Sequence, residues 1–161
     1  MIQLSDRLLS MEESATIAMS RKSRELKASG KDVISLSLGE PDFNTPEFIK
    51  DAAKEAMDNN FTKYMPVPGY EDLRESISNK FKRDNNLHYS KDQIVVSTGA
   101  KQSIANVVLT LINPGDEVII PAPYWVSYIE IVKVSGGIPV IVNAGIEKDF
   151  KISGEDLSRA I

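Results

Sequence analysis

Gly99, Ala100 and Lys101 form the first group whose residue types and spacing could do chemistry. They follow an apolar run at 94–96 and precede a helical pattern. Small residues let backbone N–H groups approach a ligand, and a helix start adds unpaired N–H groups and a positive dipole end. These groups favour a phosphate or a carboxylate, and Lys101 adds a mobile positive charge. A plain tight turn explains the pattern equally well, because neither a GxGxxG nor a Walker sequence is present.

Trp125, the only tryptophan, is the second candidate and stands in the stretch PAPYWVSY. The prolines hold the chain in a fixed path, so the indole face could stack on a planar ligand. Core packing is the more frequent role of a tryptophan, since this residue type is highly buried on average. A third candidate, Gly39, allows close backbone approach in the loop SLGEPDFNTP, although a turn before a helix explains it more simply.

Composition excludes several other classes of function. The chain has 161 residues, a net charge of −4 and scattered basic residues, which argues against a nucleic-acid-binding face. It has no cysteine, so a disulfide framework and a thiolate zinc site are excluded, and we expect no metal site. No apolar run is long enough for a bilayer, and the N-terminus lacks the apolar core of a signal peptide. The expected compartment is the cytoplasm.

The elements that must position these candidates follow from periodicity and turn signals. The first half predicts a helix over 16–30 that is closed by Gly30, and a strand over 33–38. It also predicts a helix that runs from the N-cap Thr45 to about Asn59, and a helix that carries Leu73 and ends near residue 84.

From residue 93 the pattern changes to alternating strands and helices. The predicted elements are strand 94–98, helix 100–112, strand 117–121, helix 124–136 and strand 138–142. Because these strands are apolar throughout, they indicate a parallel sheet with helices on both faces. Ligands of such sheets bind outside the carboxyl ends of strands, where Gly99 and Trp125 both stand.

The last predicted helix follows an N-cap at Ser153 and stops at Ile161 without a glycine cap. A single helix of this length is marginal in water, so we interpret the end as a cut chain.

Four stretches, in this order, resemble the N-terminal part of the class I aminotransferases that use pyridoxal 5′-phosphate. They are SLGEPDFNTP, TKYMPVPGYEDLRESI, VVSTGAKQSI and INPGDEVIIPAPYWVSY. The branch resembled is that of bacterial and plant aspartate aminotransferases, some of which accept prephenate. The resemblance implies an α/β fold, namely an incomplete N-terminal portion of the large domain with a mainly parallel sheet flanked by helices. Residues 1–45 would be the N-terminal arm, helix and first strand of the small, substrate-closing region. Residues 46–161 would begin the cofactor-binding domain.

The resemblance also implies cofactor contacts. The backbone of Gly99 and Ala100, with Lys101, corresponds to the place where the family binds the cofactor's phosphate. Trp125 corresponds to the residue that stacks on the pyridine ring. Tyr64 corresponds to the tyrosine that crosses a homodimer interface to the neighbour's phosphate.

Substrate contacts are implied for Gly39, Lys101, Trp125, Ser14 and Thr16. Gly39 corresponds to a glycine beside the α-carboxylate of the substrate, and Lys101 to a lysine that reaches the distal carboxylate. Ser14 and Thr16 correspond to a mobile segment that closes over the substrate. The implied partners are an amino acid and a 2-oxo acid.

The family's catalytic residues are expected beyond Ile161, including the Schiff-base lysine, the aspartate at the pyridine nitrogen and the arginine at the α-carboxylate. No catalytic residue is therefore expected within this chain. Strands supplied later are expected to separate the first predicted strand from the other two. Alone, the chain should bind the cofactor poorly and not transaminate. Two alternatives are a related carbon–sulfur lyase and a non-catalytic fragment that binds a phosphate ligand or a partner chain.

Overall fold

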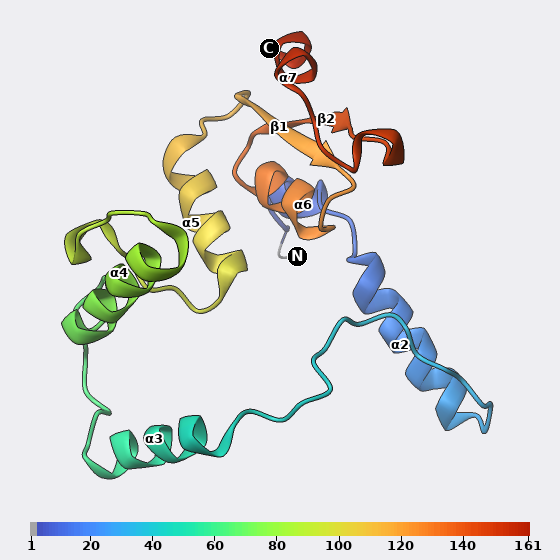
Figure 1. Cartoon of the computed structure of the whole chain (residues 1–161). Helices are drawn as coiled ribbons and strands as arrows, with labels where there is room; N and C mark the ends of the chain where they lie inside the picture. Colours follow the sequence, from blue (N-terminus) through green and yellow to red (C-terminus); the bar gives the residue numbers. More distant parts are fainter. Residues whose placement is uncertain (1–2) are drawn as a thin grey trace. The chain divides into compact units, whose positions relative to one another are not determined.

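Two compact packing units make up the chain in the computed structural model, which describes residues 3–161 (Figure 1). One unit combines Met1–Gly39 with Lys101–Ile161, and the other is Glu40–Ala100. The helices are α1 (Asp6–Leu9), α2 (Ala15–Ala28), α3 (Glu47–Asp58), α4 (Glu71–Asn85), α5 (Ala100–Leu111), α6 (Ser127–Val134) and α7 (Gly154–Ala160). The strands are β1 (Glu117–Ala122) and β2 (Ile138–Asn143), and the 3₁₀ turns are η1 (Lys91–Gln93) and η2 (Ile146–Lys148).

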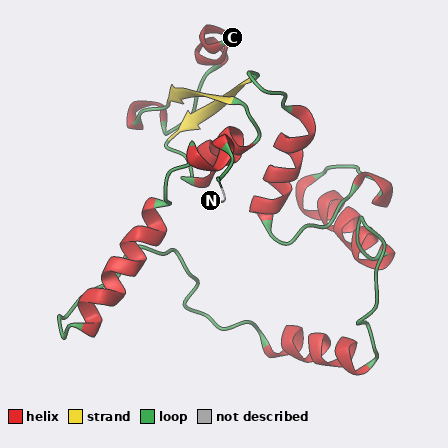
Figure 2. Ribbon diagram, turned by 180° about the vertical axis from the view of Figure 1, so that it is seen from behind, coloured by secondary structure: helices red, strands yellow, loops and turns green. Residues whose placement is uncertain are grey.

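The sheet of the first unit consists of β1 and β2, which run parallel as Figure 2 shows. Their register pairs Glu117 with Ile138 and Ala122 with Asn143. Helix α6 connects the two strands and packs on them, with Val132 only 2% exposed. The prediction of parallel, helix-covered strands is thus confirmed for this β–α–β unit.

Two predicted strands, 33–38 and 94–98, are wrong for this structure, because both segments are irregular. A strand needs a hydrogen-bonded neighbour, and β1 and β2 are the only paired strands between residues 3 and 161. Segment 33–38 instead exposes its apolar side chains, with Ile34 85% and Leu36 90% exposed. The predicted βαβαβ run is therefore shortened to one β–α–β unit.

The predicted helices match the observed ones with shifted ends. Helix α3 begins at Glu47, so the N-cap is Pro46 and not Thr45, because Pro46 has an extended ψ of 143°. Helix α6 is shorter than predicted, since Val126 is its N-cap and Ser135 its C-cap. Helices α2, α4 and α5 lie close to their predicted ranges.

Arg74 and Gly69 organise the second unit. The Arg74 guanidinium donates to the Gly69 carbonyl at 3.2 Å and to the Lys91 carbonyl at 2.9 Å, which joins α4 to η1. The backbone N–H of Val96 donates to the Pro68 carbonyl at 2.9 Å. These contacts fix the path of the chain that leads toward residue 99.

Ser153 is the N-cap of helix α7, as predicted, and forms a complete capping box. The Asp156 carboxylate accepts from the Ser153 backbone N–H at 2.9 Å, and the Ser153 hydroxyl accepts from the Asp156 N–H at 3.1 Å. Lys148 Nζ lies 2.9 Å from the same carboxylate and Arg159 2.6 Å from it. The short helix is therefore tied to η2 and lies against β2.

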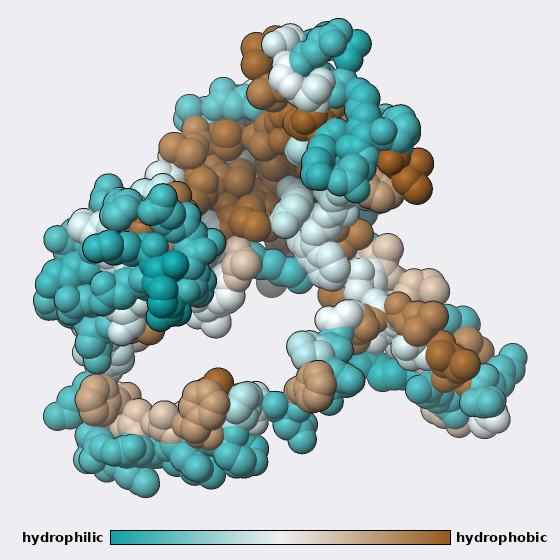
Figure 3. Space-filling view, in the orientation of Figure 1, coloured by the Kyte–Doolittle hydropathy of each residue, from teal (hydrophilic) through white to brown (hydrophobic). Residues whose placement is uncertain are grey.

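Much apolar surface remains uncovered in the first unit. Figure 3 shows apolar side chains gathered over α5 and β1. Val107, Leu109 and Leu111 of α5 are all more than half exposed. Within residues 3–161, no helix combines the length and the apolar character needed to cross a lipid bilayer.

Candidate functional site

The bend before α5 is open and requires a glycine. Gly99 has a φ of +86°, a conformation that L side chains rarely adopt, and its N–H donates to the Ser97 carbonyl at 2.8 Å. A Cβ added at Gly99 would meet no heavy atom within 4 Å. Ala100 begins α5 directly after the bend and is exposed. The first helical turn carries N–H groups without intrahelical acceptors, so this open bend can receive an anion.

Lys101 and Trp125 are brought together by the fold. Lys101 Nζ lies 5.1 Å from the centroid of the Trp125 ring, within the range of a cation–π contact. Trp125 is 44% exposed, so it does not serve as a core residue in this chain. Its Nε1–H donates to Ser127 Oγ at 3.0 Å, which holds the indole at the start of α6. The positive charge of Lys101, the second residue of α5, thus lies over the exposed aromatic face of Trp125.

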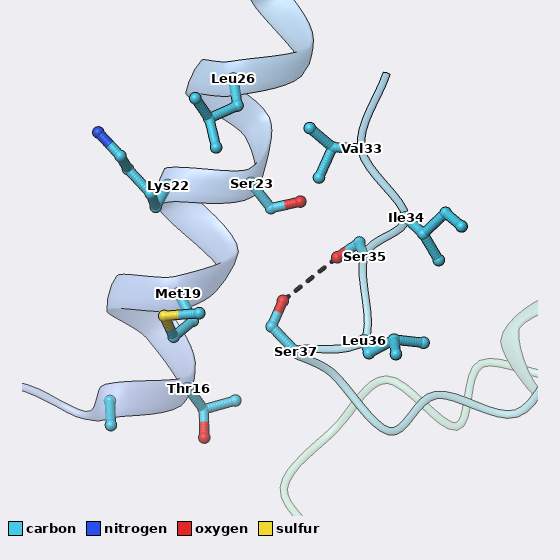
Figure 4. A pocket seen from close by; sticks show the side chains of 11 residues that line it. Thr16, Met19, Lys22, Ser23, Leu26, Val33, Ile34, Ser35, Leu36 and Ser37 are labelled. Carbon is cyan, nitrogen blue, oxygen red and sulfur yellow. Dashed lines mark hydrogen bonds between the residues drawn. The ribbon is translucent and has the colours of Figure 1, made fainter. Parts of the chain in front are cut away.

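Ser14 and Thr16 flank two hollows of the first unit. Ser14 is the N-cap residue of α2 and lines a hollow of about 280 Å³ with Val126, Ser127 and Glu130. It therefore stands beside the residues that directly follow Trp125. Thr16 instead lines a larger hollow of about 530 Å³ between α2 and segment 33–37, which Figure 4 shows from close by.

Gly39 and Tyr64 both lie in open surroundings within their own units. Gly39 ends the first part of the first unit, and an added Cβ there would meet no heavy atom within 4 Å. Tyr64 belongs to the second unit, and its side chain is fully exposed.

Glu130 is a residue of this region that sequence analysis missed. Its Oε2 accepts a hydrogen bond from the backbone N–H of Glu12 at 3.2 Å, across 118 residues of sequence. Its Oε1 pairs with Lys133 Nζ at 3.1 Å. The i, i+3 spacing of Glu130 and Lys133 could have indicated their ion pair, but nothing in the sequence indicates the contact with residue 12.

A family profile described as "Aminotransferase class I and II" matches residues 31–161 of the chain. This chain belongs to that aminotransferase family. The aspartate/prephenate aminotransferase of Nitrosomonas europaea is 52% identical over 160 residues, which are 99% of this chain and 40% of the relative. The family resemblance drawn from the four sequence stretches is confirmed.

Solved aminotransferase structures share the fold. The aspartate aminotransferase of Rhizobium meliloti is 41% identical, with a TM-score of 0.94 over 99% of this chain and 40% of that one. The Thermus thermophilus aspartate aminotransferase with maleate is 43% identical, with a TM-score of 0.94 over 100% of this chain and 42% of that one. The chain therefore spans about 40% of the relatives it matches. The predicted fold, an incomplete N-terminal α/β portion of such an enzyme, is confirmed.

Proposed function

We propose that this chain is part of a pyridoxal 5′-phosphate-dependent aminotransferase. The enzyme would move the amino group of a dicarboxylic amino acid, with aspartate as the preferred substrate, to a 2-oxo acid. The names of the relatives support transamination over the carbon–sulfur lyase alternative. The observation that carries the proposal is the Lys101 ammonium over the Trp125 indole, with Lys101 two residues after the open bend at Gly99 in the sequence.

The residues present fit the proposed cofactor. Its phosphate is a dianion, and the Gly99 bend, the start of α5 and Lys101 offer N–H groups and a positive charge. Its pyridine ring is flat and electron-poor, and Trp125 offers an exposed aromatic face. When bound, the cofactor supplies an electron sink, while the protein binds and orients it.

Four residues of this chain would bind the substrate or close over it. Lys101 would face the distal carboxylate, because a cation is the natural partner for the second acid group. Gly39 leaves room for a carboxylate beside the backbone, since nothing lies within 4 Å of its Cβ position. Ser14 and Thr16 would close over the substrate at the start of α2.

A homodimer and a two-domain organisation belong to the same proposal. The fully exposed ring of Tyr64 suits a residue that reaches the phosphate of a second copy in a homodimer. Residues 1–45 would belong to the substrate-closing region and residues 46–161 to the cofactor-binding domain. The setting would be cytoplasmic. This chain by itself would not turn over substrate, because the resemblance implies that the family's Schiff-base lysine corresponds to none of its residues.

Lys101→Met tests the substrate assignment in a protein of the relatives' full length that carries this chain. A hydrogen bond to a charged group contributes about 1.5–3 kcal/mol, so kcat/KM for aspartate should fall by about tenfold or more. For an aromatic amino acid, which lacks the second acid group, it should fall much less.

The matched control is Lys54→Met, which removes an exposed lysine of α3 that pairs with Asp51. It should leave both substrates unaffected. Equal losses for aspartate and for the aromatic amino acid in Lys101→Met would refute the role of Lys101 at the distal carboxylate.

A further inference from the structure

The connection between α1 and α2 accepts support from one side chain of another helix, the Glu130 carboxylate of α6. Helix α1 ends at Leu9 with Ser10 as its cap, and α2 starts after Ser14, so residues 11–13 belong to neither helix. The Glu12 N–H lies in the middle of this connection and donates to Glu130 Oε2 at 3.2 Å. The bond joins the N-terminal part of the first unit to α6.

Glu130 is built to hold its position. Its side chain is 19% exposed, and Lys133, one helical turn further on, pairs with its other oxygen at 3.1 Å. The Lys133 pair orients the carboxylate, so one oxygen remains directed at the connection. Helix α1, which precedes Glu12 in the chain, also packs on α6, the helix that carries Glu130 (Figure 1).

The same helix carries the indole. Trp125 Nε1–H is bonded to Ser127 Oγ at the start of α6, and Glu130 lies three residues after Ser127 on the same helical face. Ser14, two residues after the bonded amide of Glu12, lines a hollow with Ser127 and Glu130. Helix α6 therefore connects the aromatic face with the segment that leads into Ser14 and Thr16.

We propose that Glu130 is a positioning residue that anchors residues 11–14 to α6 and so sets where Ser14 and Thr16 stand relative to Trp125. The anchor itself follows from the contacts of this chain. Its consequence for substrate closure rests on the proposed function. Glu130 touches neither cofactor nor substrate in this assignment and acts only through the connection.

Amide hydrogen exchange in this chain tests the anchor without any cofactor. Glu130→Met removes the acceptor and keeps a helix-forming side chain of similar length. It should speed exchange of the Glu12 amide on the order of tenfold. Glu130→Gln keeps an acceptor oxygen and should stay within about threefold of the unchanged protein. The matched control, Glu155→Met, removes an exposed carboxylate of α7 and should change nothing at Glu12.

Amides of the β1–β2 ladder, such as those of Ile138 and Ala144, report whether the unit stays folded. If Glu130→Met loosens this ladder as well, Glu12→Pro decides instead, because it removes the donor and leaves α6 unchanged. Its readout is the Ala18 amide, which donates to the Ser14 carbonyl at 3.0 Å and should exchange faster once Ser14 is no longer anchored. Equal exchange at Glu12 in Glu130→Met, Glu130→Gln and the unchanged protein would overturn the anchor.

The functional consequence is tested by kinetics in a protein of the relatives' full length that carries this chain. Glu130→Met should raise KM for aspartate several-fold and change kcat by less than about twofold, with Glu130→Gln restoring most of the loss. Glu12→Pro should match Glu130→Met, and the double variant should add no further loss. An equal fall of kcat for every substrate would overturn the positioning role. So would a double variant whose loss equals the sum of the losses in the two single variants. Absence of all transaminase activity would instead refute the proposed function, and the exchange result would stand by itself.

Discussion

Asp156 is the buried charged residue among residues 3–161. Its side chain is 8% exposed, and it accepts from Lys148, Arg159 and both the backbone N–H and the hydroxyl of Ser153. The hydrogen bond from Lys148, followed by those from Ser153, holds the pKa of the Asp156 carboxyl well below its ordinary value. One carboxylate thereby caps α7, neutralises two cations and joins the helix to η2.

This arrangement predicts an acid-sensitive last helix. A lowered pKa in the folded state means that Asp156 contributes stability above its unfolded pKa of about 3.9 and loses that contribution as pH falls toward its folded pKa. The protection factors of the α7 amides, which compare exchange with the intrinsic rate at the same pH, should therefore fall below about pH 4, by on the order of tenfold. In Asp156→Asn, protection should be lower at neutral pH and nearly independent of pH in this range. A wild-type helix whose protection does not respond to acid would contradict this account.

At the residue scale, sequence reasoning identified the local part of this cluster only. The N-cap at Ser153 with acidic residues in the first turn was visible because capping uses neighbours in sequence. The contribution of Lys148 was not visible, since it depends on how η2 turns back toward α7. The candidate site shows the same limit: the bend at Gly99 is a local signal, whereas the bond from Glu12 to Glu130 is not.

At the scale of elements, the close approach of Gly69 to Val96 holds the loop before α4 against the chain that leads to α5. Gly69 has a φ of +101°, and an added Cβ would stand 2.8 Å from Val96 Cγ2. The Val96 N–H bond to Pro68 lies beside this contact. The loop TKYMPVPGY therefore supports the segment that carries the bend.

Gly69→Ala should accordingly destabilise the second unit more than a glycine substitution made in open space. Both Gly69 and Gly30 have positive φ, so each alanine costs about 1–2 kcal/mol of backbone strain. Gly69→Ala adds an overpacking cost of about 1–3 kcal/mol, because its Cβ meets Val96, whereas at Gly30 nothing lies within 4 Å. Urea unfolding of the two variants measures the difference. Equal losses of stability would show that the contact with Val96 is not tight.

Element prediction succeeded where the partners of an element lie within this chain. β1 and β2 pair directly with each other, and α6 connects them, so their apolar pattern predicted strands with nearly the observed bounds. Segments 33–38 and 94–98 have the same apolar character, but no described strand pairs with them. Apolar character indicates that a segment can be buried in a sheet. It does not supply the neighbour that makes the segment a strand.

At the scale of the whole molecule, few apolar residues are buried. Among residues 3–161 the buried apolar residues are Ile94, Ile120, Val132 and Ala144. Large apolar side chains of segment 33–38 and of α5 are exposed instead. Since the chain spans about 40% of its relatives, these surfaces suit contact with further protein.

The chain studied by itself should therefore bind a hydrophobic dye such as ANS and self-associate as its concentration rises. Replacing Ile34 and Leu36 by serine removes two of its most exposed apolar side chains and should lower both signals. The α-helical circular dichroism should stay unchanged, because neither residue lies in a helix. Dye fluorescence and sedimentation velocity provide the measurements. A monomer that binds no dye at high concentration would contradict this expectation.

The open, left-handed bend at Gly99 has a stereochemical consequence. Its φ of +86° is one that L side chains rarely adopt and that D residues adopt readily, because their φ preferences are mirrored. A chemically synthesised chain with D-alanine at position 99 would keep the bend and narrow the conformations open to the unfolded polypeptide. L-alanine and D-alanine at position 99 would differ only in handedness, and we expect only the D residue to retain the bend without strain.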